Sequence, residues 1–169
     1  MTQRRRLNLA GFLACAALLG YAYYAQYQLN LEPCPLCIFQ RVGVAAIGVV
    51  FLLAALQDPK GFGARVYGVL VLLAALATIG VAGRHVWIQH LPEGSVPACG
   101  ATLEYLRELF PLTTVIRKVL TGSGECAQVT WTFLTLSMPT WVLIAAAGLG
   151  GLGLWANFGS RPPAGLRWK

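Results

Sequence analysis

Four long apolar runs constrain this chain more than any other feature. Runs 7–29 and 139–158 carry no charge, run 38–56 has one charge at its start, Arg41, and run 66–87 is uncharged up to Gly83. A hydrocarbon core of about 30 Å needs roughly 20 helical residues, and only helices or closed barrels satisfy their backbone in lipid. Because the runs are continuous and do not alternate, they predict four membrane-spanning helices.

The composition supports a chain that is solvated largely by lipid. Hydrophobic residues make up 57% and charged residues 11%, whereas an ordinary soluble domain has about 25% charged residues. We therefore expect an all-α membrane protein, a four-transmembrane-helix bundle that forms a single integral membrane domain over residues 1–169. Run 7–29 also begins like a signal peptide, but it is longer than the usual apolar region of about 7–15 residues and no small-residue cleavage site follows it.

The basic residues predict the orientation. The N-terminal segment, the connection 57–65 and the C-terminal tail together hold eight of them, whereas the long loop 88–138 holds three. The positive-inside rule therefore predicts cytoplasmic termini and outward-facing, periplasmic loops at 30–37 and 88–138. The net charge of +7 is spread over the ends of the runs, so we expect no nucleic-acid partner.

The cysteines divide unevenly between the two sides. Of the five, Cys15 lies inside the first run and is expected to be an inert, buried thiol, while the other four fall in the two outward loops. The outer side of a bacterial inner membrane permits disulfides. Cys34-Pro35-Leu36-Cys37 is a C-x-x-C motif at the mouth of the second run, a pattern that lowers thiol pKa values and gives exchangeable disulfides.

Several interpretations of these residues remain open. Arg41, one helical turn after Cys37, either favours a thiolate there or snorkels to lipid headgroups. Cys99 and Cys126 form either a structural staple or a pair that exchanges with the C-x-x-C. An all-cysteine zinc site is a further alternative, with His85 and His90 as additional ligands. Because Cys99 and Cys126 lack the usual close spacing, we expect no metal. The apolar positions between 112 and 120 predict a short amphipathic helix that lies in the interface or packs on the spans.

The chain resembles the DsbB family of bacterial inner-membrane disulfide bond formation proteins. The matching segments are Pro33-Cys34-Pro35-Leu36-Cys37-Ile38-Phe39-Gln40-Arg41, then His85 and Gln89, and then Gly124-Glu125-Cys126-Ala127 followed by Trp131, Phe133, Met138-Pro139 and Trp141. The resemblance covers most of the chain. It implies a thiol oxidase of the inner membrane that reoxidises the periplasmic dithiol oxidase DsbA and passes two electrons to a membrane quinone, ubiquinone or menaquinone.

The resemblance also implies roles for individual residues. Reduced DsbA would attack the Cys99–Cys126 disulfide at Cys99, Cys126 would attack Cys34, and Cys37 would become a thiolate facing the quinone. Arg41 would favour that thiolate and the charge developing on the quinone. His85 and Gln89 would line the quinone pocket, or else only anchor the interface, and Gln26 occupies a similar family position. The competing hypothesis is a non-enzymatic membrane protein with a structural disulfide and a thiol metal site.

Overall fold

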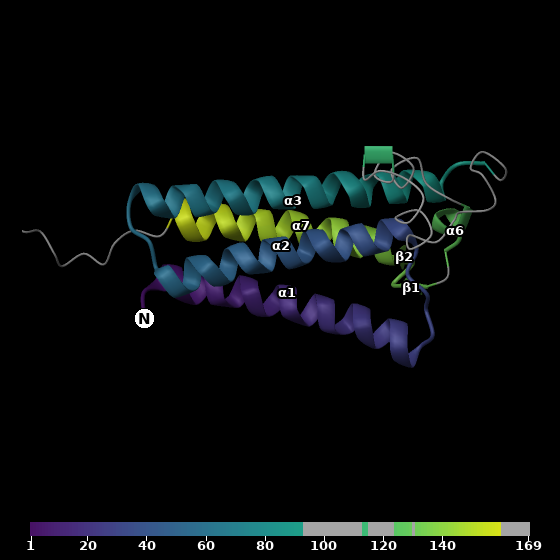
Figure 1. Cartoon of the computed structure of the whole chain (residues 1–169), viewed down its shortest axis with the longest axis horizontal. Coiled ribbons are helices and arrows are strands. Elements are labelled where there is room, and N and C mark those ends of the chain that lie inside the picture. The colour runs from purple at the N-terminus through teal and green to yellow at the C-terminus, as the bar shows by residue number, and fades with distance from the viewer. Residues whose placement is uncertain (93–112, 115–123, 130, 160–169) are drawn as a thin grey trace, which may run out of the picture.

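Helices long enough to cross a membrane dominate the structure. The computed structural model of the chain describes residues 1–92, 113–114, 124–129 and 131–159. Within these residues four helices are long and apolar enough to span a bilayer. They are α1 (Gln3–Gln28), α2 (Pro35–Gln57), α3 (Phe62–Gln89) and α7 (Met138–Leu154), the last continued by the π-helix η1 (Trp155–Gly159). The predicted four-helix membrane bundle is confirmed (Figure 1).

Helices α2 and α3 extend at both ends beyond the apolar runs that predicted them, and one extension changes the setting of the C-x-x-C motif. Helix α2 begins at Pro35, so Cys37 lies within its first turn and not in the preceding connection. Proline is favoured there because its missing N–H has no helical partner in a first turn. Helix α3 continues to Gln89, so His85 and Gln89 both lie on regular helix.

Glycine permits the closest helix contacts of the core. Helix α1 packs on α2, α2 on α3 and α3 on α7. Phe51 is fully buried at the centre, and a Cβ atom added to Gly11 would lie 2.8 Å from its ring. A Cβ added to Gly153 would lie 2.4 Å from Val71. Side chains larger than hydrogen at these two positions would therefore push the helices apart.

The outer surfaces of the helices are apolar, as expected for side chains that face lipid. Each of the four carries exposed aliphatic residues, for example Leu13, Val49, Leu73 and Ile144. Exposed apolar surface of this extent is rare on a monomeric soluble protein. The helices are thus solvated by the bilayer, and their buried faces form the core.

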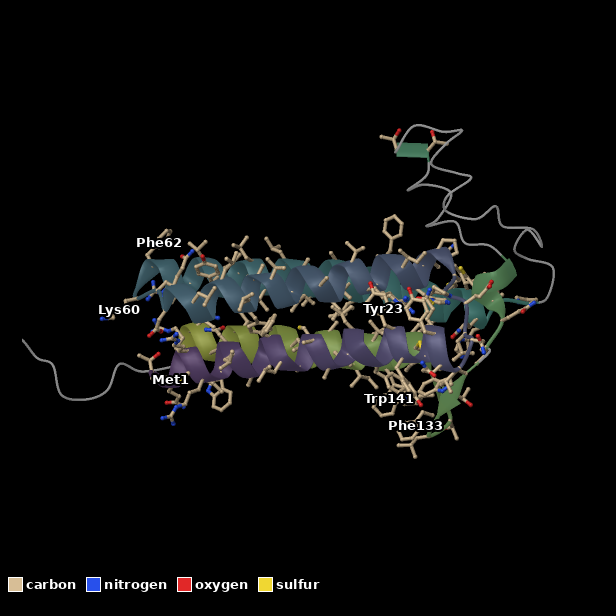
Figure 2. All side chains as sticks on the ribbon, turned by 60° about the horizontal axis from the view of Figure 1, so that its bottom comes forward. Met1, Tyr23, Lys60, Phe62, Phe133 and Trp141 are labelled. Carbon is tan, nitrogen blue, oxygen red and sulfur yellow. The ribbon has the colours of Figure 1, made fainter. Side chains whose placement is uncertain are left out.

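The two ends of the bundle differ in what they carry. Met1, Lys60 and Phe62 lie at one end, and Tyr23, Phe133 and Trp141 lie at the other (Figure 2). The second end also holds the short elements α6 (Gly124–Ala127), β1 (Thr132–Phe133) and β2 (Leu136–Ser137) (Figure 1). Strands β1 and β2 form an antiparallel hairpin that pairs Thr132 with Ser137. This hairpin was not predicted, since two-residue strands carry no usable periodicity.

Part of the predicted second loop lies outside the described residues. This applies to Cys99 and to the predicted amphipathic helix between 112 and 120, of which only Thr113 and Thr114 are described. The C-terminal tail 160–169 lies outside them as well. Cys15 lies within α1 and is buried, in agreement with the expected inert thiol.

Candidate functional site

The C-x-x-C motif forms the N-terminal turn of α2. Cys34 is the N-cap residue with extended backbone (φ −64°, ψ 162°), and Pro35 follows in the first turn. The backbone N–H of Ile38 donates to the Cys34 carbonyl. This geometry places both thiols on one side of the helix end, with their sulfur atoms 3.2 Å apart. The pair is therefore within reach of disulfide formation without a change of helix position.

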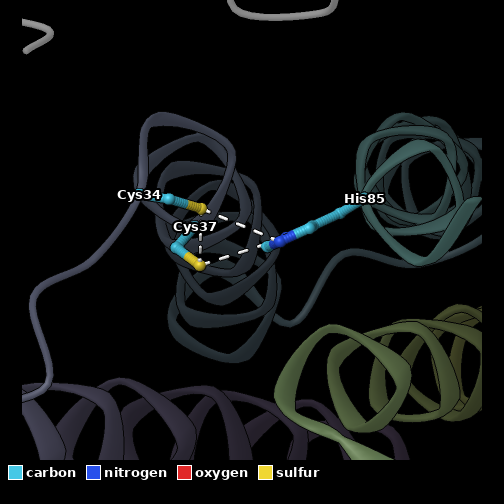
Figure 3. A group of neighbouring side chains, drawn as sticks. All are labelled: Cys34, Cys37 and His85. Carbon is cyan, nitrogen blue, oxygen red and sulfur yellow. Dashed lines mark hydrogen bonds between the residues drawn. The ribbon is translucent and has the colours of Figure 1, made fainter. Parts of the chain in front are cut away.

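His85 on α3 points at both sulfur atoms. Its Nε2 lies 3.8 Å from Cys34 Sγ and its Nδ1 lies 4.0 Å from Cys37 Sγ (Figure 3). The imidazole is buried, at 3% exposure. Its Nδ1 is 2.9 Å from the side-chain amide Nε2 of Gln40, and its Nε2 is 3.1 Å from the carbonyl oxygen of Cys126.

These contacts select one form of the imidazole. A carbonyl oxygen only accepts, so the ring Nε2 of His85 carries a hydrogen and donates it to Cys126. The ring Nδ1 is then the acceptor for the Gln40 amide. His85 thereby connects the helix that carries the C-x-x-C to the segment that carries the third predicted cysteine.

Cys126 lies on α6 in the same apolar cluster as Cys34, Leu36 and Ile88. Its side chain is 1% exposed. The structure thus brings together three of the four cysteines predicted to react, and the fourth, Cys99, lies outside the described residues. All three are at the end of the bundle opposite Met1 and Lys60, which agrees with the predicted segregation of the cysteines to one side.

Arg41 is held by α1. One guanidinium nitrogen donates to the Ala22 carbonyl at 3.0 Å, another donates to the Gln26 side-chain oxygen, and the guanidinium lies 5.2 Å from the centre of the Tyr23 ring. These contacts orient a half-buried positive charge next to the C-x-x-C turn. Gln26 therefore acts on Arg41, and it is not among the residues that line the cavity described next.

A cavity of about 1040 Å³ adjoins the thiols. Its polar wall contains Cys34, Cys37, Gln40, Arg41, His85 and Gln89. Its apolar walls come from α1, α2, α7 and the hairpin region, and they include Leu18, Leu19, Val44, Trp131, Pro139 and Val142. Helix α3 contributes only His85 and Gln89 to the lining. A large, mainly apolar pocket with a few convergent polar groups is the usual form of a small-molecule site.

Gln89 joins the cavity to the start of α7. Its side-chain oxygen accepts a hydrogen bond of 2.8 Å from the hydroxyl of Ser137, which is the N-cap residue of α7. Aromatic rings continue the wall: Tyr21 on α1 contacts Trp131 edge-on, Trp131 stacks on Phe133, and Phe133 contacts Trp141. The indole N–H of Trp141 donates to the Phe133 carbonyl at 3.1 Å.

Gln40 is the residue that sequence reasoning did not assign. It belonged to the matching segment 33–41 but had no predicted role, although it is 97% removed from solvent. A polar side chain three residues after Cys37, on the same face of an otherwise apolar helix, could have indicated that Gln40 belongs to the site. Its partner His85 lies 45 residues away, and no local pattern pairs two side chains at that separation.

Comparison with known proteins agrees with the geometry. Residues 4–156 match the family model described as disulfide bond formation protein DsbB. The chain is 52% identical over 145 residues to disulfide bond formation protein B of Nitrosococcus oceani, covering 86% of each protein. It is 51% identical over 155 residues to the protein of that name from Methylococcus capsulatus, covering 90% of this chain and 94% of the relative. The corresponding protein of Chromobacterium violaceum is 53% identical over 152 residues.

These matches extend over nearly the whole described bundle, including the C-x-x-C turn, His85 and Cys126. They agree with the four membrane-spanning helices, which make this a multi-pass protein of the inner membrane. The chain belongs to the DsbB family of disulfide bond formation proteins.

Proposed function

We propose that this protein reoxidises a periplasmic dithiol oxidase of the DsbA type and passes the two electrons to a membrane quinone. The observation that carries the proposal is the placement of Cys34, Cys37 and Cys126 against a cavity of about 1040 Å³ at one end of a membrane bundle. A thiol relay at a membrane surface is thereby joined to a space that a lipid-soluble acceptor can enter.

The relay begins with two thiol–disulfide exchanges. A thiolate of the partner attacks Cys99 of a Cys99–Cys126 disulfide, which forms a partner–Cys99 disulfide and releases Cys126 as a thiolate. Cys126 then attacks Cys34 of a Cys34–Cys37 disulfide, which forms a Cys34–Cys126 bond and releases Cys37 as a thiolate. The burial of Cys126 supports Cys99 as the point of attack, because a thiol that is 1% exposed is not accessible to another protein.

The second exchange is supported by the packing around His85. The Cys126 carbonyl accepts from His85, and the same ring lies beside Cys34 Sγ. The imidazole thus holds the Cys126 backbone next to the sulfur that Cys126 must attack. Orientation of this kind lowers the entropy cost of bringing the two sulfur atoms together.

The cavity residues fit a quinone. Ubiquinone or menaquinone, when bound, would supply an acceptor of two electrons and two protons. Apolar side chains such as Leu18, Leu19 and Val44 would surround it. Arg41 would hold positive charge close to the developing negative charge, and its bonds to Ala22 and Gln26 keep the guanidinium in place without reorganisation. Cys37 and His85 line the same cavity.

We also propose that both termini are cytoplasmic. Arg4, Arg5 and Arg6 lie in the first turns of α1. Lys60 lies at the same end of the bundle as Met1, opposite the cysteines (Figure 2). The positive-inside rule predicts that such a basic end is cytoplasmic. In a chain whose five native cysteines are replaced by serine, Lys60→Cys should resist an impermeant maleimide in intact spheroplasts and should react after lysis. A Gln128→Cys variant at the cysteine end should react before lysis. The reverse pattern would invert the topology.

Quinone reduction by defined variants tests the proposal. With the reduced partner as electron donor, Cys37→Ser should abolish quinone reduction while a partner–Cys99 disulfide still accumulates. Cys15→Ala is the matched control, because Cys15 is buried within α1 away from the thiol cluster, and it should reduce quinone at the rate of the unaltered protein. Quinone reduction by Cys37→Ser would refute the assignment of the electron exit. The non-enzymatic hypothesis instead predicts thiols that neither partner nor quinone changes.

A further inference from the structure

We propose that Cys34, Cys37 and His85 form a binding site for a thiophilic divalent cation of the Zn²⁺ class, open only when both cysteines are reduced. The proposed electron transfer needs no metal, so this site is additional to it. It also differs from an all-cysteine site, since a histidine takes part and Cys99 and Cys126 do not.

The ligand atoms already lie near coordination geometry. One ligand atom from each of the three residues can be chosen so that all lie within 4.8 Å of one another. The sulfur atoms are 3.2 Å apart and the ring nitrogens lie 3.8 and 4.0 Å from them. Tetrahedral zinc with Zn–S of about 2.3 Å and Zn–N of about 2.0–2.1 Å separates its ligands by about 3.5–3.8 Å. The two distances to His85 involve different ring nitrogens, and one nitrogen must serve both sulfur atoms. Because the three ligand atoms lie within 4.8 Å of one another, a side-chain adjustment of up to about 1 Å would complete the site.

The outer partners that such a histidine needs are present. A metal-binding imidazole usually engages a carbonyl or an amide through its second nitrogen, which fixes the ring. In this structure Nε2 faces the Cys126 carbonyl and Nδ1 faces the Gln40 carboxamide. Whichever nitrogen binds the cation, the other keeps a partner, because a turned Gln40 carboxamide presents its oxygen to an Nδ1–H.

Charge and burial also favour the cation. Cys34 is 9% exposed and His85 3% exposed, and two thiolates in such a place would be costly without compensation. A divalent cation with two thiolates and a neutral imidazole forms a complex of zero net charge. All three residues line the cavity, which gives the cation a route in and leaves room for water at the fourth position.

The redox state controls the site. Coordination consumes both thiols as thiolates and releases two protons, whereas a Cys34–Cys37 disulfide offers no thiolate. The cation therefore competes with formation of that disulfide. An inhibitory effect on thiol oxidation rests on the proposed function; the binding itself does not.

Direct binding to the full-length protein in detergent tests the site. The protein is reduced with a phosphine, which does not compete strongly for the metal, and is titrated with Zn²⁺ against a chromophoric chelator. Co²⁺ is used in parallel, because its visible spectrum reports tetrahedral thiolate coordination. We expect one ion per reduced chain, none after oxidation with diamide, and recovery after renewed reduction.

Variants locate the ligands. Cys34→Ser and His85→Ala should each weaken binding by more than the roughly 10–100-fold that loss of an outer partner costs. His90→Ala is the matched control, since His90 is exposed and bonds to Val86 at the end of its own helix, and it should bind like the unaltered chain. The double variant Cys99→Ser/Cys126→Ser should also retain one ion. Helical circular dichroism confirms folding, and Cys34→Ser decides the matter if His85→Ala does not fold.

Four results would overturn the site. They are the absence of binding to the reduced chain, binding that survives oxidation, binding that survives both Cys34→Ser and His85→Ala, and loss of the ion from the Cys99→Ser/Cys126→Ser variant, which would indicate an all-cysteine site. Quinone reduction by the metal-free enzyme is measured separately. Failure of that assay with normal binding would refute only the proposed function, and normal quinone reduction without binding would refute only the cation site.

Discussion

Polar side chains pair at both ends of the bundle, but only those at the cysteine end also face a cavity. At the end that holds Met1 and Lys60, polar side chains pair with each other: Asn8 and Asn157 exchange amide hydrogen bonds of 3.4 and 3.2 Å, and Thr2 donates to Asp58 at 2.8 Å. At the cysteine end, Arg41, His85 and Gln89 line a cavity. The first arrangement closes the bundle, and the second leaves functional groups facing a space that a ligand can fill.

The connections between helices show the same contrast. Helices α2 and α3 are joined by a short turn that is fixed by Asp58, whose backbone is left-handed (φ 42°), and by a bond from Arg4 to the Pro59 carbonyl. The cysteine end is built from the N-cap of α2, α6 and a two-stranded hairpin. The long helices α2 and α3 thus position the Cys34–Cys37 pair and His85, while Cys126 lies on the short, separate helix α6.

Replacing Arg41 should give the largest change that separates the two ends. We expect Arg41→Met to lower quinone reduction about 100-fold, the usual size for removing one preorganised charge or donor from a reacting centre. Exchange between the partner and Cys99 should continue, because that step does not involve the cavity. Stopped-flow measurement of each step resolves the two.

Arg65→Met supplies the control for Arg41. Arg65 is exposed and lies in the first turn of α3, at the closed end. The substitution removes the same charge and should leave quinone reduction unchanged. Equal losses in both variants would indicate that net charge, and not the position of the guanidinium, determines the rate.

The sequence predicted the bundle because its signal is local. Uninterrupted apolar runs of helical length report burial in lipid without reference to any other part of the chain. The C-x-x-C turn was also visible locally, since Cys34, Pro35 and Cys37 are adjacent in sequence. Cysteine segregation to one side followed from charge alone, and the structure places Cys34, Cys37 and Cys126 at one end.

Contacts between helices could not be predicted in this way. The pairing of His85 with Gln40 joins α2 and α3, and that of Asn8 with Asn157 joins residues 149 positions apart. Such pairs depend on the rotation of each helix about its axis, which neighbouring helices determine through packing. For the same reason the bond between Arg41 and Gln26 could not be predicted, and the role of Gln26 in binding a quinone stays a prediction.

At the closed end, breaking the amide pair should affect stability and not chemistry. Asn157→Ala leaves the fully buried Asn8 amide without its partner. An unsatisfied buried polar group costs about 1–3 kcal/mol, so the free energy of unfolding in mixed micelles should fall by about that amount. Quinone reduction, measured well below the melting temperature, should stay within twofold of the unaltered protein. A specific loss of turnover would mean that the two ends are coupled.

The double variant Asn8→Ala/Asn157→Ala sharpens this result. Because both partners of the pair are then absent, it should be less destabilised than the sum of the two single variants. Additive losses would show that each asparagine is stabilised mainly by other contacts. One such contact is the 2.9 Å bond from the Asn157 amide to the Gly153 carbonyl.

Gln26→Ala should give the smallest effect, and it tests how Arg41 is held. The substitution removes one acceptor from the guanidinium but leaves the Ala22 carbonyl and the Tyr23 ring in place. Loss of one hydrogen bond to a charged group is worth about 1.5–3 kcal/mol, and the remaining contacts should retain much of this orientation. We therefore expect quinone reduction to fall less than tenfold in the single variant. If Gln26 acts only through Arg41, adding Gln26→Ala to Arg41→Met should change nothing further, whereas a second independent loss would give Gln26 a contact of its own with the quinone.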